Sequence, residues 1–129
     1  MLETSNRPWG KWEDLHHDPE QPYRVRKITV NPGAKLSVQY HLNRAEVWTV
    51  VEGEGIAYVS NLPFDADAAD LKIAEIEVKV GSYVEVPLQH IHSIEVLESA
   101  KAPLVFIEVQ IGLSTEDDIV RLEDRYGRD

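Results

Sequence analysis

The sequence predicts an all-β domain, a sandwich or barrel of short antiparallel strands. Short segments rich in β-branched and aromatic residues recur through the middle of the chain, and turn signals such as Asn31-Pro32-Gly33 separate them. A helical apolar period is visible only near the end of the chain. Short strands at this spacing are typical of sandwiches and closed barrels.

Eight strands are expected after an N-terminal arm. The first 22 residues show no clean period, and we expect an ordered arm that Trp9 and Trp12 anchor to the domain. Glycine and proline punctuate the segments that follow, for example at Gly81 and Pro87. The predicted strands cover residues 24–30, 36–42, 46–51, 56–60, 71–80, 83–86, 91–97 and 104–111, with a polar loop at 61–70.

The C-terminal tail is predicted to be a short helix. Residues 114–117 read Ser-Thr-Glu-Asp, which resembles a capping box with acidic residues in the first turn. Ile119, Val120 and Leu122 then give a weak apolar stripe. The expected role of this helix is packing against the barrel.

Length and composition bound the domain organisation. A chain of 129 residues fits one domain, with an arm at 1–22, a barrel at 23–112 and a helix at 113–129. The absence of cysteine excludes a disulfide framework, a zinc-thiolate site and a thiol nucleophile. It also suits a reducing cytoplasm. We find no signal-peptide pattern and no membrane-spanning apolar run, so a cytoplasmic protein without membrane association is expected.

The charge is negative overall but locally basic. A net charge of -10 and a pI near 4.9 argue against nucleic acid as a partner. Residues 22–44 contain five basic residues and no acid, which leaves -15 on the remaining 106 residues. This basic window could be a chance cluster on a solvated strand, or it could attract a small anion such as a phosphate ester.

Four polar residues can converge on one face of the predicted barrel. Gln39 and His41 share a face because side chains alternate along a strand, and Glu46 opens the next strand after a turn. His92 lies much later in the chain on a strand of its own. A single histidine on a strand is usually structural, but two imidazoles, a carboxylate and an amide oxygen form a plausible shell for one divalent metal ion.

The spacing of these residues resembles the first motif of the cupin family. Gly33 is followed after five residues by Gln39-Tyr40-His41, then after four by Glu46, and after six by Gly53. The motif has histidine where this chain has Gln39. The second motif is matched by Gly81, by Pro87 and by His92, with Gln89 in the place of a glycine. The chain thus resembles a cupin, a small jelly-roll β-barrel.

The resemblance narrows to the isomerase domain of type II phosphomannose isomerases, and it covers nearly the whole chain. It is carried by Arg7-Pro8-Trp9-Gly10, by Pro32-Gly33-Ala34-Lys35-Leu36-Ser37-Val38-Gln39-Tyr40-His41, by Arg44-Ala45-Glu46-Val47-Trp48, and by Asp124-Arg125-Tyr126-Gly127-Arg128. Val47 and Ser93 stand where that family has His and Arg, at positions that the resemblance implies are near the substrate.

This resemblance implies a metal-dependent sugar-phosphate isomerase that interconverts mannose 6-phosphate and fructose 6-phosphate. The metal ion, which could be Mn, Fe, Zn, Ni or Co, would be held by Gln39, His41, Glu46 and His92. Oxygen ligands favour Mn or Fe. Three residues are candidates for the group that moves the proton: Glu46, Glu108 and His90. Candidates for binding the substrate phosphate are Lys35, Arg44, Arg125 and Arg128.

Other interpretations remain open at this stage. His90 could instead be a rim or surface residue, and each basic residue could be solvated surface charge. The substitutions Val47 and Ser93 motivate a second function, a non-catalytic metal-binding cupin that binds a sugar, a sugar phosphate or another small anion. An iron dioxygenase is a weaker third class, because cupins of that class usually present three histidines and one glutamate. Exposed strand edges make a homodimer the expected assembly.

Overall fold

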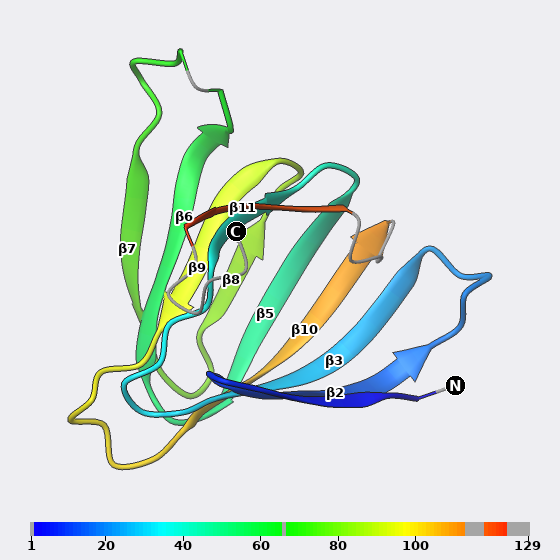
Figure 1. Cartoon of the computed structure of the whole chain (residues 1–129), viewed down its shortest axis with the longest axis vertical. Coiled ribbons are helices and arrows are strands. Elements are labelled where there is room, and N and C mark those ends of the chain that lie inside the picture. The colour runs from blue at the N-terminus through cyan, green and yellow to red at the C-terminus, as the bar shows by residue number, and fades with distance from the viewer. Residues whose placement is uncertain (1, 66, 113–117, 124–129) are drawn as a thin grey trace.

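The computed structural model describes residues 2–65, 67–112 and 118–123, and in these residues the protein is all-β, as the sequence predicts. Two antiparallel sheets lie on either side of a common interior, with β11 on the viewer's side in Figure 1. The strands are β1 (Thr4–Arg7), β2 (Gly10–His17), β3 (Tyr23–Val30), β4 (Val38–His41), β5 (Arg44–Glu52), β6 (Gly55–Pro63), β7 (Ile73–Val78), β8 (Tyr83–Val86), β9 (His90–Glu95), β10 (Leu104–Gly112) and β11 (Ile119–Glu123).

The strand order explains how distant segments meet in the interior. One sheet has the order β1-β2-β3-β10-β5-β8 and the other has the order β11-β4-β9-β6-β7. The chain therefore crosses between the sheets after β3, β4, β5, β7, β8, β9 and β10, which is the jelly-roll type of connection. Strands β3 to β10 confirm the eight predicted strands, although β6 continues to Pro63, into the predicted loop.

A hydrophobic core fills one end of the interior. The inward side chains there come from both sheets and are almost completely buried: Val30, Val50, Ala57, Ile94, Val96, Leu104 and Phe106. Those that lie within strands follow the two-residue alternation of the strand, and Val96 directly follows β9. Burying a side chain of this size stabilises the fold by about 1.5–3 kcal/mol.

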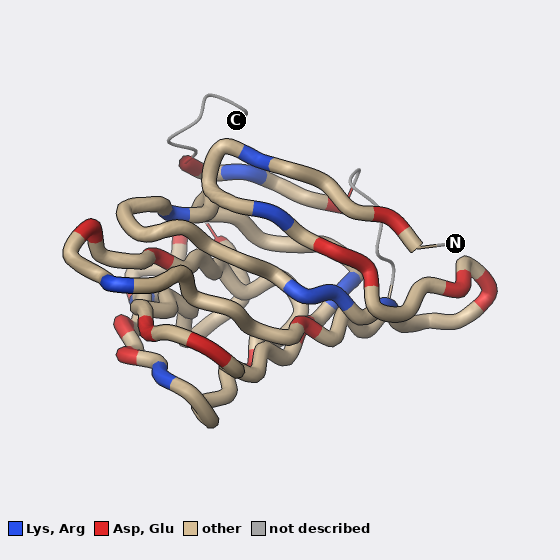
Figure 2. The backbone as a smooth tube through the Cα atoms, turned by 90° about the horizontal axis from the view of Figure 1, so that it is seen from below, with Lys and Arg blue, Asp and Glu red and all other residues tan. Residues whose placement is uncertain are grey.

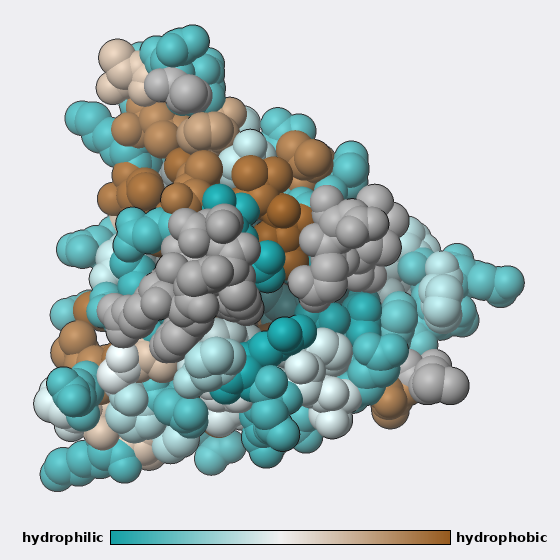
Figure 3. Space-filling model, viewed as in Figure 1, coloured by the Kyte–Doolittle hydropathy of each residue, from teal (hydrophilic) through white to brown (hydrophobic). Residues whose placement is uncertain are grey.

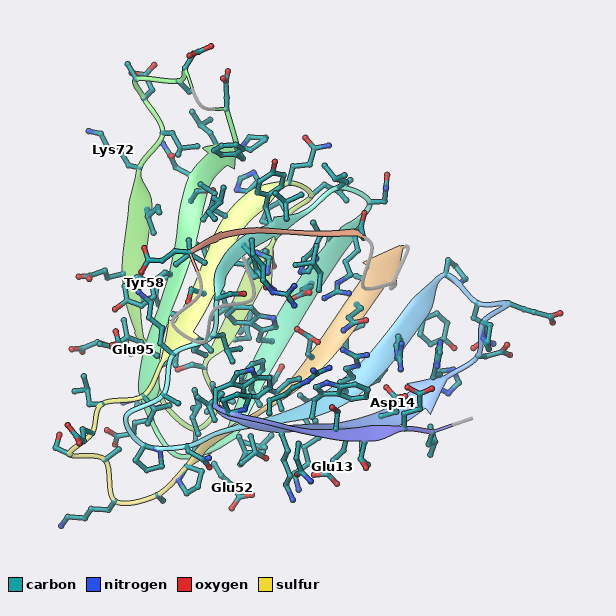
Figure 4. The ribbon with its side chains drawn as sticks, viewed as in Figure 1. Glu13, Asp14, Glu52, Tyr58, Lys72 and Glu95 are labelled. Atoms are coloured by element: carbon teal, nitrogen blue, oxygen red, sulfur yellow. The ribbon has the colours of Figure 1, made fainter. Side chains whose placement is uncertain are left out.

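The N-terminal arm is part of the six-stranded sheet. Its strand β2 pairs with β3, with Trp12 opposite Ile28, and the buried Trp9 and Trp12 confirm that these two residues anchor the arm. Gly10 is required at the turn between β1 and β2, because a Cβ atom there would lie 2.0 Å from the Thr29 carbonyl oxygen. Figure 4 shows Glu13 and Asp14 on opposite sides of β2, which is the alternation of a strand.

The predicted C-terminal helix is wrong for Ile119–Glu123, which form β11 and pair with β4. The apolar residues of this segment complete the sheet edge beside β4 instead of packing as a helical stripe. Asp118 explains the path: its buried carboxylate accepts hydrogen bonds from the backbone N–H and the side-chain amide of Asn43, at 3.0 to 3.1 Å. The other residues of the predicted helix, 113–117 and 124–129, lie outside the described residues.

No helix in the described part of the chain is long and apolar enough to cross a membrane.

Candidate metal centre

Three neighbouring strand segments bring two histidines and a glutamate together inside the barrel. His41 ends β4, Glu46 lies near the start of β5, and His92 lies on β9, which pairs with β4. Their side chains are 1% to 3% exposed. One ligand atom from each residue lies within 4.8 Å of the other two. The sequence prediction that these three residues converge is therefore confirmed.

The distances within the cluster match the spacing of ligands on one ion. His41 Nε2 lies 3.0 Å from Glu46 Oε2 and 3.2 Å from His92 Nε2, and His92 Nε2 lies 3.8 Å from Glu46 Oε1. Adjacent ligands of an octahedral ion with bonds of about 2.1 Å are about 3 Å apart. The set is two histidines and one carboxylate, which leaves coordination positions for other oxygen ligands.

The protonation states also suit a cation. His92 Nδ1 lies 3.0 Å from the His90 carbonyl oxygen, which can only accept, so Nδ1 carries the proton and Nε2 presents its lone pair to the cluster. Burial lowers the pKa of His92 to about 4, which keeps the ring neutral. Burial alone would raise the pKa of Glu46, but Arg44 and the two histidines hold it well below its usual range. A neutral imidazole and an ionised carboxylate are the forms that bind metal, so the residues fit a divalent ion.

Arg44 and Trp48 fix the carboxylate of the cluster. Arg44 Nε donates to Glu46 Oε2 at 2.8 Å, and Trp48 Nε1 donates to Glu46 Oε1 at 2.9 Å. Arg44 Nη2 also lies 3.1 Å from His41 Nε2. The sequence predicted Arg44 as a phosphate ligand. The structure places it against the metal-binding atoms, with Glu46 as its ion-pair partner.

A second carboxylate lies beside the cluster on β10. Strand β10 pairs with β5, so that Gln110 lies opposite Glu46 and Glu108 lies opposite Trp48. The Gln110 side-chain Nε2 donates a hydrogen bond of 2.7 Å to Glu108 Oε2. Burial raises the pKa of Glu108 to about 8, and the neighbouring Glu46 carboxylate contributes to the rise. The two glutamates therefore have opposite states near neutral pH: Glu46 is ionised and Glu108 holds a proton. Two carboxyl groups whose pKa values are this far apart can take different roles, one electrostatic and one acid–base.

A small cavity opens next to these residues. Its volume is about 80 Å³, much less than the volumes of two surface grooves, about 720 and 1120 Å³. We assign this cavity to the functional site because of its lining residues and not because of its size. Figure 3 shows a hollow near the middle of this face with strongly hydrophilic residues beside it. The residues lining the cavity are Arg7, Trp9, Trp12, Arg26, Ile28, Leu36, Ser37, Gln39, Arg44, Glu108, Ile119 and Arg121.

Gln39 and His90 have different relations to the cluster. Gln39 lies on the cavity wall, opposite His92 in register, and its Oε1 accepts a hydrogen bond of 2.5 Å from the Ser37 hydroxyl. Its role as a metal ligand stays a prediction. His90 is not among the clustered residues, and its Nδ1 lies 2.8 Å from the Ser60 carbonyl oxygen. Its backbone carbonyl orients His92, so the geometry supports a positioning role rather than the predicted catalytic one.

Lys35, another predicted phosphate ligand, does not line the cavity. The Lys35 ammonium lies 5.1 Å from the centre of the Tyr58 ring, and the Tyr58 hydroxyl donates to Glu95 at 2.7 Å. Figure 4 shows Tyr58 and Glu95 at the outer side of the five-stranded sheet, so Lys35 faces away from the cluster. Arg125 and Arg128 lie outside the described residues.

The substituted family positions do not face the cluster either. Val47 alternates with Glu46 and Trp48 and is therefore on the outer face of β5. The Ser93 hydroxyl donates to the Leu36 carbonyl oxygen at 2.7 Å, and Ser93 lies opposite the outward-facing Tyr58. The expectation that these two positions contact substrate is not supported by the geometry.

A buried charge network was missed at the sequence level. The Asp14 carboxylate accepts hydrogen bonds from Arg24 Nε and Nη2 at 2.8 and 2.6 Å and from Arg26 Nε at 3.3 Å. The Arg26 guanidinium also stacks over Trp12, 3.7 Å from the centre of the ring. Figure 2 shows the acidic segment of β2 beside the basic segment of β3. The available signal was alternation, because both arginines share a face with the core residue Ile28.

Comparison with known proteins shows the family of the chain. The family model "Mannose-6-phosphate isomerase C-terminal" matches residues 1–124. The chain is 40% identical over 126 residues to "Mannose-1-phosphate guanylyltransferase ManC" of Salmonella typhimurium, covering 95% of this chain and 22% of that protein. It is 40% identical over 123 residues to "Alginate biosynthesis protein AlgA" of Pseudomonas aeruginosa, with the same coverage of 95% and 22%. The chain thus spans about a fifth of the length of these relatives.

Solved structures support the fold. The capsular polysaccharide assembling protein CapF from Staphylococcus aureus superposes with a TM-score of 0.77 at 21% identity, over 95% of this chain and 33% of that chain. A mutant of Bacillus subtilis oxalate decarboxylase gives a TM-score of 0.74 at 17% identity, over 94% and 30%. The fold is therefore a cupin barrel, and the chain belongs to the mannose-6-phosphate isomerase C-terminal family.

Proposed function

We propose that this chain is a metal-dependent isomerase domain that interconverts mannose 6-phosphate and fructose 6-phosphate. The observation that carries the proposal is the buried cluster of His41, Glu46 and His92 with a second buried carboxyl group, that of Glu108, beside it on β10. Membership of the family supplies the substrate class. The metal ion, the exact sugar, the cytoplasmic location and the homodimer remain predictions.

The isomerisation moves a proton between C2 and C1 of the sugar while the carbonyl changes place. Glu108 suits this step, because a group with a pKa of about 8 can both accept and return a proton near neutral pH. His41, Glu46 and His92 would hold the metal ion, and Gln39 could add an amide oxygen. When bound, a divalent ion would stabilise the negative charge that develops on the two sugar oxygens. Arg44 and Trp48 would keep the Glu46 carboxylate oriented.

The test starts with elemental analysis of the purified chain, followed by a coupled assay for fructose 6-phosphate in the presence of Mn, Fe, Co, Ni or Zn. His92→Ala should lose bound metal and at least about 100-fold in turnover, since changes even around a metal ligand cost about 10- to 100-fold. His16→Ala is the matched control, because His16 contacts Gln21 and Tyr23 and is not in the cluster.

The absence of turnover with every metal, in a chain that binds metal through His92, would contradict the isomerase. That result would favour the second function, a non-catalytic cupin that binds a sugar phosphate or another small anion. Its original motivation, the substitutions Val47 and Ser93, is weakened because neither side chain is on the face of the cluster.

A further inference from the structure

The wall of the small cavity carries an excess of positive charge. Its lining contains four arginines and one acidic residue, Glu108. Four guanidinium groups against one carboxyl group leave the lining with net positive charge. Arg44 is paired with Glu46, and the other three arginines of the lining are Arg7, Arg26 and Arg121. A cavity with this charge attracts anions.

Arg26 is held in place but keeps donors available. Its guanidinium stacks over Trp12 at 3.7 Å, and its Nε donates to Asp14 at 3.3 Å. Neither of its terminal amino groups makes a hydrogen bond to a residue in the described part of the chain. The Asp14 carboxylate is shared with Arg24, which binds it at 2.6 Å, so Arg26 is only partly neutralised. A rigid guanidinium with unused donors is suited to binding a phosphate.

Arg7 approaches the same opening from the edge strand. It ends β1, directly before the tight turn that requires Gly10. Its side chain is half-buried and makes no hydrogen bond or ion pair to any residue within 2–65, 67–112 or 118–123. A half-buried cation without a protein partner has a desolvation cost that an anionic ligand would offset.

Arg121 reaches the cavity from the opposite sheet. In register it lies beside Gln39 on β4, and Gln39 lies beside His92 on β9. Residues directly opposite each other on paired strands share a face, so Arg121 is on the same face as the metal cluster. The three arginines therefore meet at the cavity from β1, β3 and β11, on both sheets.

We propose that Arg7, Arg26 and Arg121 form an anion subsite that binds the phosphate group of the substrate, while His41, Glu46 and His92 bind the sugar end through the metal ion. This assignment rests on the proposed function and replaces Lys35 as a phosphate ligand. Three guanidinium groups from two sheets can surround a dianion and donate several charge-assisted hydrogen bonds to it. A neutral sugar could accept hydrogen bonds from them but would lack the charge attraction that strengthens binding of a phosphate.

The first experiment measures binding without chemistry. Mannose 6-phosphate, inorganic phosphate and mannose are titrated into metal-free chain by calorimetry. Wild type should bind the two phosphates and not mannose, and Arg7→Gln and Arg26→Gln should each weaken phosphate binding about 10-fold or more, as expected for a lost charged hydrogen bond. Arg26→Lys keeps the charge and should recover part of the affinity. Lys11→Gln is the matched control, because Lys11 is an exposed cation on the outer side of β2.

Unchanged phosphate affinity in folded Arg7→Gln and Arg26→Gln would overturn the subsite, and so would equal losses in Lys11→Gln. Kinetics separate this failure from failure of the isomerase. If turnover exists and Arg7→Gln leaves KM unchanged, the isomerase stands and the subsite is wrong. If the arginines control phosphate affinity but no metal supports turnover, the subsite stands and the isomerase is wrong.

Discussion

The two ends of the barrel interior are built by the same strands and have opposite chemistry. The apolar end presents Ile28, Val30, Val50, Ile94, Leu104 and Phe106. The polar end presents Arg24, Arg26, Glu46, His92, Glu108 and Gln110. On β3, β5, β9 and β10 the inward-facing side chains change between polar and apolar along the same strand. Trp48 lies at the boundary: its ring centre is 5.2 Å from that of Phe106, and its Nε1 donates a hydrogen bond to Glu46.

This difference separates stability from function. The apolar end removes hydrocarbon from water, which is the main favourable term in folding. The polar end buries charges, which stabilise little or even destabilise unless they are paired. Arg24 is paired with Asp14 and Arg44 with Glu46, but three acceptor groups of the metal cluster face one another. We infer that the apolar end supplies the stability that lets the polar end keep an arrangement suited to a ligand.

The largest expected effect is at the apolar end. Phe106→Ala should destabilise the protein by about 3–5 kcal/mol, because it removes a buried ring and leaves a cavity below Trp48. Urea denaturation measures the change. Ile111→Ala is the control on the same strand, since Ile111 is 50% exposed, and it should cost much less. Equal losses in the two variants would show that the apolar end does not carry the stability.

The polar end should make the free energy of unfolding depend on pH. The folded-state pKa of Glu108 is raised to about 8, so between about pH 5 and 8 the metal-free folded protein binds more protons than the unfolded chain. Stability should therefore fall as pH rises through this window, by up to about 1.4 kcal/mol per pH unit for one proton. Glu108→Gln mimics the protonated acid and should remove this component.

The measurement compares urea midpoints of chelator-treated wild type and Glu108→Gln from pH 5 to 8. Glu85→Gln, an exposed position on β8, should follow wild type. Parallel curves for wild type and Glu108→Gln would mean that Glu108 is ionised in the folded protein throughout this range. In that case Glu108 could not hold the proton that the proposed mechanism assigns to it.

A smaller effect is expected from backbone strain near the polar end. Gln89 has φ of 64°, the left-handed region that favours glycine, and its N–H donates to the His41 carbonyl oxygen at 3.1 Å. Gln89→Gly should stabilise the protein by about 0.5–1 kcal/mol, because relief of strain exceeds the added chain entropy. Leu88→Gly lacks this relief and should destabilise it. Thermal unfolding distinguishes the two, and a loss of stability in Gln89→Gly would indicate that its side-chain contact with Leu42 matters more than strain.

Several features were predictable because they depend on local pattern. Alternation along the strands places His41, Glu46 and His92 on inward faces, and the turn signals bound β3 to β10. The strands of the N-terminal arm are harder to predict from the sequence. Trp12 and Asp14 both face inward on β2, but one is apolar and the other is charged, so no apolar alternation is visible. β11 was mistaken for a helix because three apolar residues within four positions suit either structure, and only the free edge of β4 decided between them.

The sequence by itself determined that this protein is an all-β barrel with two histidines and a glutamate of the cluster facing inward, because strand periodicity and motif spacing are properties of the local chain. Only the tertiary structure decided that Lys35 faces outward, that Arg7, Arg26 and Arg121 meet at one cavity, and that Glu46 and Glu108 have opposite protonation states. The physical reason is that charge pairing and desolvation depend on which distant strands become neighbours. Strand pairing, and not local sequence, creates those environments.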